Sequence, residues 1–228
     1  MRNGLAALVI AGGSLFFCVS AIAAPFSIQL GRDKMVIDTP VGFADTAAFG
    51  SPRLTEIAET IADASNRVLV FALADSDVRR FGAGDSLELR RYLLAVTPKA
   101  RERERISPEQ FAELVADTER NLAEPPASAD FLAFLKTRPA GQSHLLAQLR
   151  RDPQVLSLLS GTMIPQPPPS MWRDAPPPTF KISTLTIALI GGRALYISAF
   201  SAYDSPADVT WIRSVTERWV EELRRLNR

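Results

Sequence analysis

The chain has very little of the residues that build metal, redox and nucleophilic sites. Its 228 residues include one cysteine, Cys18, and one histidine, His144. A single cysteine excludes an intramolecular disulfide and a zinc site made of several cysteines, and a single histidine excludes any site with several histidine ligands. Lysine occurs only four times and never three residues after a serine, which excludes the S-x-x-K arrangement of one class of nucleophilic serine.

The chain also lacks an excess of either charge. Its 26 Lys and Arg residues against 25 Asp and Glu residues give a net charge of +1, which does not indicate binding to nucleic acid or to a charged membrane surface. Nucleotide-binding glycine motifs are absent, and so is the G-x-S-x-G turn that would accompany His144 as a catalytic base. No cofactor and no metal are therefore predicted.

The first 23 residues predict a secretory signal peptide. Arg2 precedes an uncharged, largely apolar stretch from Leu5 to Phe26, and Ala21-Ile22-Ala23 fits the pattern of small residues at a cleavage site. Cleavage after Ala23 would place residues 24–228 in the periplasm or outside the cell. The length and the 46% hydrophobic content of the chain are typical of a single globular domain, which we assign to this mature segment.

Two alternatives for the N-terminus stay open. An uncleaved anchor is possible because the uncharged run is as long as the roughly 20 residues that span a bilayer. A lipoprotein modified at Cys18 is the other alternative, although Phe17 is large for the position before the modified cysteine.

Short strands and capped helices are expected through the first half of the mature chain. Ser51-Pro52 places a cap residue before a proline at the first helical position, and Ser107 begins a capping box with Gln110. Strands are predicted at the apolar runs 26–30, 35–39, 68–73 and 87–96. Residues 75–85, between the last two strands, are expected to form a loop because they are rich in Asp and Gly.

The next part of the chain predicts a helical insertion followed by a linker. Residues 131–164 contain leucine-rich pieces at 131–135, 145–149 and 155–159 that resemble short helices of an insertion or lid. Half of residues 165–178 are proline, which favours an extended linker because proline cannot donate a backbone hydrogen bond.

The last 49 residues give the clearest structural signal. Two β-rich runs, 180–190 and 193–202, flank Gly191-Gly192, which is typical of a two-residue hairpin turn. Ser205, Pro206 and Asp208 then form a capping box with a proline at the first helical position. The helix that follows is amphipathic, and we expect its apolar face, which includes Trp219 and Leu223, to pack inward.

This order of elements predicts an α+β fold in which helices cover an antiparallel sheet. The opening hairpin runs into Thr39-Pro40-Val41-Gly42-Phe43, and the chain closes with the hairpin 185–202 and the helix 208–226. In these features the chain resembles the Mog1/PsbP-like α+β sandwich group over about half of the mature chain. The resemblance implies a sheet covered by helices and is compatible with an accessory role in a larger assembly, although fold alone does not fix function.

Three carboxylates and three large side chains are the candidate functional residues. Asp75, Asp77 and Asp85 are oxygen ligands of the kind that calcium prefers, but their spacing is not that of an EF-hand and ordinary turn residues are the favoured interpretation. The possible partner contacts are Met171 and Trp172, inside the proline-rich stretch, and Trp211, at the edge of the apolar helix face. Trp172 holding the linker against its own domain, and Trp211 forming the rim of the core, are the structural alternatives.

The function favoured by these observations is a non-catalytic binding or accessory module of the bacterial cell envelope. An envelope protein is the expected partner, and nucleic acid is not. The alternative is a periplasmic enzyme whose carboxylates, among them Asp75, Asp77 and Asp85, converge only in the fold.

Overall fold

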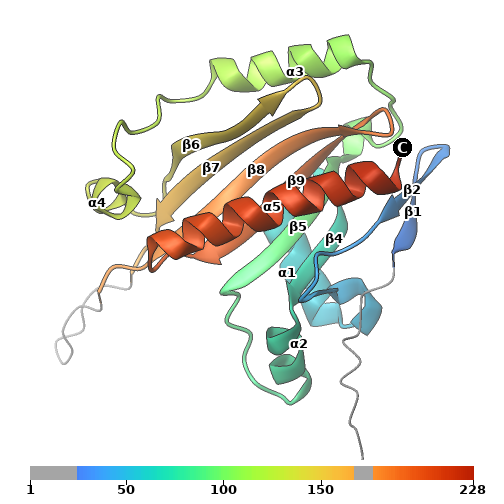
Figure 1. Cartoon of the computed structure of the whole chain (residues 1–228). Coiled ribbons are helices and arrows are strands. Elements are labelled where there is room, and N and C mark those ends of the chain that lie inside the picture. The colour runs from blue at the N-terminus through green and yellow to red at the C-terminus, as the bar shows by residue number, and fades with distance from the viewer. Residues whose placement is uncertain (1–24, 167–176) are drawn as a thin grey trace, which may run out of the picture.

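The computed structural model describes residues 25–166 and 177–228 and has an α+β architecture (Figure 1). Its main sheet has seven antiparallel strands in the order β3-β4-β5-β9-β8-β7-β6, and β1 pairs with β2 in a separate hairpin. The strands are β1 (Phe26–Leu30), β2 (Asp33–Ile37), β3 (Phe43–Asp45), β4 (Asn66–Ala74), β5 (Arg91–Pro98), β6 (Ser143–Asp152), β7 (Val155–Met163), β8 (Phe180–Ile190) and β9 (Arg193–Ala202). The α-helices are α1 (Pro52–Ala62), α2 (Asp75–Gly82), α3 (Pro108–Arg120), α4 (Phe131–Lys136) and α5 (Pro206–Leu226).

The closing hairpin lies at the centre of the sheet, as β8 and β9. Both glycines of its turn have positive φ, 56° at Gly191 and 75° at Gly192, which a two-residue hairpin turn requires. The predicted bounds of both strands are confirmed. Because β9 pairs with β5 on its other side, the hairpin joins the earlier and later halves of the chain into one sheet.

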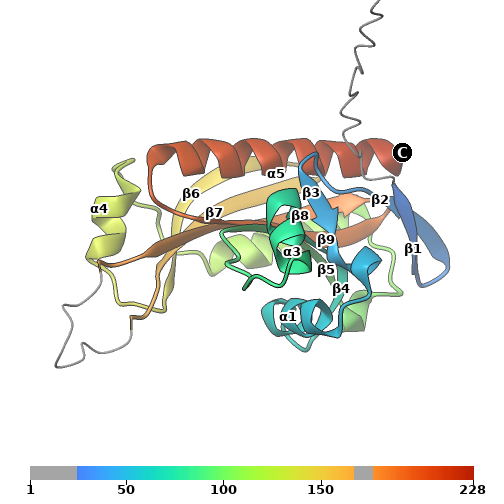
Figure 2. The ribbon, with the colours of Figure 1, turned by 90° about the horizontal axis from the view of Figure 1, so that it is seen from below.

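Helix α5 covers one face of this sheet (Figure 2). Its apolar face is buried as expected, with Trp219 only 1% exposed and Leu223 fully buried. The β1–β2 hairpin packs in the same hydrophobic cluster, and the side chain of Asn227 pairs with the backbone of Val36, accepting at 2.9 Å and donating at 2.7 Å. The C-terminal helix therefore holds the opening hairpin as well as the sheet.

Two helices cover the opposite face at separate places. Helix α1 packs on β4 and β5 through Leu54 and Ala58, and α3 packs on β7 and β8 through Phe111 and Val115. Both helices begin at the serine-proline pairs identified in the sequence, and the Ser107–Gln110 capping box of α3 is formed. The prediction of a sheet covered by helices is thus confirmed.

The expected helical insertion at 131–164 is wrong for most of its length. Only α4 is helical, whereas the leucine-rich runs 145–149 and 155–159 lie in β6 and β7, joined by a turn at Pro153-Gln154. Strand β7 carries leucine on both sides because both of its faces are buried, and a strand buried on both faces loses the alternation that distinguishes it from a helix. Helix α4 then packs on β7, where Gly161 leaves room for Leu135.

The expected loop at 75–85 is also wrong, because residues 75–82 form α2. Asp75 and Asp77 lie in its first turn and Arg79 and Arg80 in its last, which is the charge order that a helix dipole favours. Strand β5 begins four residues later than predicted. Before it, Leu87 and other apolar side chains pack against the α1 cluster instead of entering the sheet.

Several predictions fall outside the described residues. The signal peptide (1–23), with Cys18 and the cleavage site, lies outside them, as does the greater part of the proline-rich linker. Within the described ranges, no helix combines the length and hydrophobicity needed to cross a bilayer.

Candidate functional site

The three predicted contact residues have different outcomes. Met171 and Trp172 lie outside the described residues. Trp211 is half-buried on α5, with its ring 6.1 Å from that of Phe43 and the guanidinium of Arg91 4.3 Å above it. Because the Trp211 ring already contacts Arg91 and Phe43, Trp211 lies at the rim of the core in this structure.

The candidate carboxylates do not form a metal centre. Asp75 and Asp77 share the first turn of α2, whereas Asp85 follows the end of that helix. Among the described residues, no three His, Cys, Asp or Glu side chains are placed to hold a metal ion. This placement gives no support to an enzyme built on these three residues.

An unpaired strand edge is the first feature that the fold adds. Strand β3 pairs only with residues 72–74 of β4, so the outer edge of β4 from Asn66 to Phe71 has no strand beside it in the described chain. A bulge between Val68 and Val70 and a charged side chain at Arg67 interrupt this edge. Both features are typical of edge strands that are protected against non-specific pairing with other chains.

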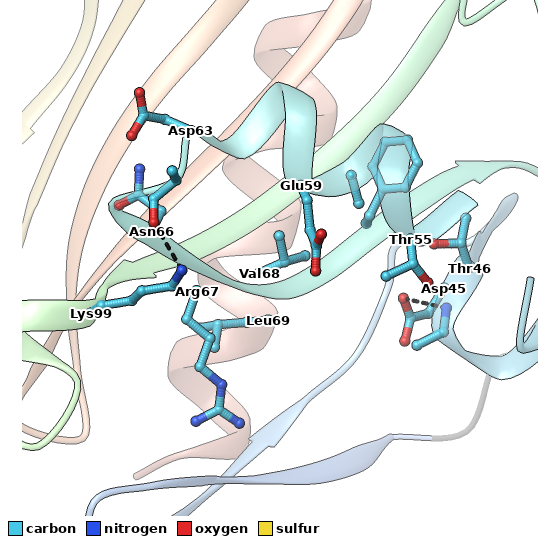
Figure 3. A pocket seen from close by; sticks show the side chains of 14 residues that line it. Asp45, Thr46, Thr55, Glu59, Asp63, Asn66, Arg67, Val68, Leu69 and Lys99 are labelled. Atoms are coloured by element: carbon cyan, nitrogen blue, oxygen red, sulfur yellow. Dashed lines mark hydrogen bonds between the residues drawn. The ribbon is translucent and has the colours of Figure 1, made fainter. Parts of the chain in front are cut away.

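A cavity of about 510 Å³ lies along this edge, which we name the edge cavity (Figure 3). Its apolar lining comes from α1 and β4, and polar side chains surround that lining. The residues that line it are Asp45, Thr46, Ala47, Thr55, Ala58, Glu59, Asp63, Ala64, Asn66, Arg67, Val68, Leu69, Phe71 and Lys99. In Figure 3, Glu59 reaches from α1 toward Val68, between Asp45 at one end and Lys99 at the other.

The charges of the edge cavity are unevenly neutralised. Arg67 pairs with Glu102, and Lys99 donates to the carbonyl of Ala64 at 2.8 Å. By contrast, Asp45 and Glu59 form no ion pair within the described chain. The cavity therefore presents two carboxylates without a cationic partner among the described residues, of which Asp45 already accepts backbone hydrogen bonds.

Burial and hydrogen bonds act in opposite directions on the carboxyl of Asp45. Burial raises its pKa, and hydrogen bonds from the backbone amides of Ala47, Phe71 and Thr46 oppose that rise. At the far end of the cavity, hydrogen bonds from the amide and hydroxyl of Ser65 lower the pKa of Asp63, against a smaller opposing effect of burial. The two ends of the cavity thus differ in electrostatic environment.

A second cavity, of about 570 Å³, is lined by four arginines, and we name it the arginine pocket. Its lining residues are Gly31, Arg32, Asp33, Arg103, Arg105 and Arg193. They come from the β1–β2 turn, from the segment after β5 and from the start of β9. The strongly basic composition of this lining contrasts with the net charge of +1 for the whole chain.

A third depression, of about 1000 Å³, lies between the turn 38–41 and the C-terminal half of α5. Two of its carboxylates are paired within the chain, Glu222 with Arg225 at 2.5 Å and Glu221 with Arg150 at 2.5 Å. Its other charged lining residues form no ion pair among the described residues and are two acidic and two basic, Asp38, Glu217, Arg218 and Arg228. The lining of this depression therefore lacks the large excess of one charge that the arginine pocket has.

Sequence reasoning missed both the edge cavity and the arginine pocket. The alternating Arg and Glu residues of 101–105 are typical of a solvated segment, and nothing in that pattern indicates that Arg103 and Arg105 share a cavity with Arg32 and Arg193. Only the strand lengths carry a signal for the edge cavity, because a three-residue strand cannot pair along all of a nine-residue neighbour.

Comparisons of the chain with protein-family models, with curated proteins and with solved structures each found no match. The resemblance to the Mog1/PsbP-like group therefore stays a prediction.

Proposed function

We propose that this protein is an exported, non-catalytic binding module of the bacterial cell envelope, and that it binds an extended segment of a partner protein along the open edge of β4. The observation that supports this proposal most directly is the coincidence of the edge cavity with the stretch from Asn66 to Phe71, which has no strand beside it. At the two ends of this stretch, the amide of Asn66 already donates to the Asp63 carbonyl and that of Phe71 to the Asp45 carboxylate, which leaves the residues between them open to a partner. A partner strand added there would continue the line that β3 begins.

Strand addition explains how this edge can give both affinity and specificity. An added strand gains affinity from main-chain hydrogen bonds to the open edge, and its alternate side chains point into whatever pocket lies beside that edge. At this edge the pocket combines an apolar surface from Leu69 and Phe71 with polar groups from α1. Its volume of about 510 Å³ lies within the range of about 300 to 1,000 Å³ that is usual for ligand pockets.

The charges of the cavity indicate the chemistry of the partner segment. Glu59 and Asp45 form no ion pair in the described chain, and opposite charges placed across an interface favour the correct partner over others. We therefore expect a segment in which apolar residues contact the floor of the cavity and a Lys or Arg side chain reaches Glu59. Lys99 and Arg67 at the other end disfavour a second cation there.

The envelope location in this proposal rests on the leader. Residues 1–23 have the charge, apolar stretch and cleavage pattern of a signal peptide, with cleavage expected after Ala23. An uncleaved N-terminal anchor would give the same module a fixed position at the membrane. Both arrangements expose the mature segment to other envelope proteins.

Site-specific crosslinking in the producing cells tests this function. A photoreactive amino acid at Glu59, which lines the edge cavity, should crosslink the full-length protein to one envelope protein. The matched control carries the same amino acid at Glu56, which is exposed on α1 but does not line the cavity. We expect the product from position 59 and not from position 56.

Hydrogen exchange on the purified complex then tests the mode of binding. If a strand is added, the amides of residues 66–71 should exchange more slowly when the partner is bound, while those of α5 should not change. Equal crosslinking from positions 56 and 59, or a complex that leaves residues 66–71 unprotected, would contradict binding at the edge of β4.

A further inference from the structure

The arginine pocket is built from three segments that are distant in the chain and are held together by one buried side chain. Arg193 is 4% exposed, and its Nη1 donates to the backbone carbonyls of Glu102 and Glu104 at 2.7 and 3.1 Å. Its Nη2 donates to Asp33 at 2.7 Å. Arg193 therefore fixes the backbone on both sides of Arg103 and the end of the β1–β2 turn.

The close approach of these segments depends on Gly31. This residue has a φ of +58°, and a Cβ placed on it would lie 3.1 Å from both the Cα of Arg103 and Nη2 of Arg193. Any other residue would meet both the conformational cost of positive φ and a tight contact with the backbone of Arg103. The position of the arginines is thus determined by the fold and not only by flexible side chains.

The lining carries a large excess of positive charge. Four arginines face a single carboxylate, Asp33, which already pairs with Arg193 at 2.7 Å and with Arg105 at 3.1 Å. Hydrogen bonding to Arg193 is the main cause that lowers the pKa of Asp33, so this carboxylate stays ionised. Even with Asp33 ionised, the lining has three more positive than negative charges.

Part of this donor capacity is unused. The Nε–H of Arg193 is buried and has no acceptor in the part of the chain that the structure describes. Arg32 and Arg103 are exposed, and neither has an ion-pair partner among the described residues. A buried donor without an acceptor is costly, and unpaired guanidinium groups around a cavity attract anions.

We propose that the arginine pocket binds the phosphate group of an anionic ligand. Guanidinium groups present planar pairs of N–H donors that match the oxygens of phosphate, and they stay charged at every physiological pH. The excess of three positive charges suits a doubly charged phosphate better than a singly charged carboxylate. A cavity of about 570 Å³ has room for the phosphate and for part of the molecule that bears it.

The same chemistry is offered by a phosphorylated solute and by the headgroup of a phospholipid. Inorganic phosphate, followed by isothermal titration of the purified protein, represents the first source. Vesicles of phosphatidylcholine with and without phosphatidic acid, followed by co-sedimentation, represent the second. Sodium chloride at matched ionic strength controls for general screening of the arginines.

Two single substitutions remove donors without removing a contact of the fold, Arg103→Gln and Arg32→Gln. The matched control is Arg101→Gln, which removes the same charge from an exposed position of the same segment but does not line the pocket. We expect Arg103→Gln and Arg32→Gln each to weaken binding about tenfold, the factor that one charge-assisted hydrogen bond supplies. Binding by Arg101→Gln should be unchanged.

The outcomes separate the two sources and decide the proposal. Binding of inorganic phosphate with this dependence on the variants supports a phosphorylated solute, and binding of phosphatidic acid vesicles alone with the same dependence supports a lipid headgroup. Absence of binding in both arms would overturn the proposal. Weakening of binding by Arg101→Gln as strong as that by Arg103→Gln would also overturn it. So would sodium chloride that, at matched ionic strength, gives the same titration signal as inorganic phosphate. In either case only the overall positive charge would matter.

Discussion

Asp208 joins the start of α5 to the sheet, and its ionisation should contribute to stability. Its carboxylate accepts from the backbone amides of Asp204 and Ser205 at 3.1 and 3.0 Å and from Arg91 at 2.9 Å. Burial acts to raise its pKa, but these hydrogen bonds outweigh burial and hold the pKa below the ordinary value of 3.8. The folded state therefore favours the ionised form.

We predict that Asp208→Asn lowers the free energy of unfolding at pH 7 by about 1 to 2 kcal/mol, the cost of impairing a helix cap. Because the pKa is lowered in the folded state, the contribution of Asp208 is complete above the unfolded pKa and is lost as the pH falls through the folded pKa. The difference from the wild type should therefore shrink below about pH 4. Urea unfolding at pH 7 and at pH 3 measures it.

Asp204→Asn is the control for this prediction. Asp204 pairs with Arg90 at 2.6 Å, but both side chains are more than half exposed, and exposed pairs contribute little. This variant should unfold nearly like the wild type at both pH values. A loss for Asp208→Asn that persists unchanged at pH 3 would show that its ionisation is not the cause.

Single residues were predictable from sequence where their partners are close in the chain. The box of Ser205 and Asp208 spans three residues and could be identified directly. The partners of Arg193 lie 89, 91 and 160 residues away, so nothing near Arg193 in the sequence indicates its role. Trp211 was placed correctly at the edge of the apolar face because helical periodicity is local, whereas its partner Phe43 could not be predicted.

At the scale of elements, α5 seals one face of the sheet mainly through Trp219. This side chain is 1% exposed, and its Nε1–H donates to the carbonyl of Asp38 at 2.8 Å. We predict that Trp219→Ala lowers the free energy of unfolding by about 3 to 5 kcal/mol, because it leaves a cavity in the core and the Asp38 carbonyl without its donor. Denaturant unfolding followed by circular dichroism measures this loss.

Trp211→Ala provides the comparison on the same helix. Because Trp211 is only half-buried and lies at the rim, its loss should destabilise the protein less than the loss of Trp219. Equal effects of the two substitutions would mean that the rim contributes as much as the core. A Trp219→Ala variant that unfolds like the wild type would remove α5 from the core altogether.

Helices and strands were predictable where their apolar residues recur with either the helical period or the strand period, and not with both. Strand β9 and α5 each have one buried side, and each is bounded by a turn or a cap residue, so the apolar period and the end signals agree. Strands β6 and β7 were mistaken for helices because leucine favours helices and because β7 has no polar face. Short apolar runs of this kind cannot be assigned from periodicity alone.

At the scale of the whole molecule, the two proposed sites depend on how distant segments meet. The edge cavity exists because β3 stops short of the open half of β4, and the arginine pocket exists because the β1–β2 turn reaches the segment after β5. The α+β class follows from the order of elements, but neither site does. A sheet with its last hairpin at the centre leaves its earliest strand at an edge, where binding is possible.

The start of the folded chain can be compared with the predicted cleavage site. Strand β1 begins at Phe26, so cleavage after Ala23 would leave only Ala24-Pro25 ahead of the fold, and the leader would not overlap the first strand. We predict that the protein is exported and that mass spectrometry of its mature form finds Ala24 at its start. Ala23→Tyr should leave the leader attached, because a large residue does not fit the position before the cut, whereas Ala24→Ser should be processed normally. Intact Met1 on the wild-type protein in the membrane fraction would instead identify an anchor, and a lipid-modified start at Cys18 would identify a lipoprotein.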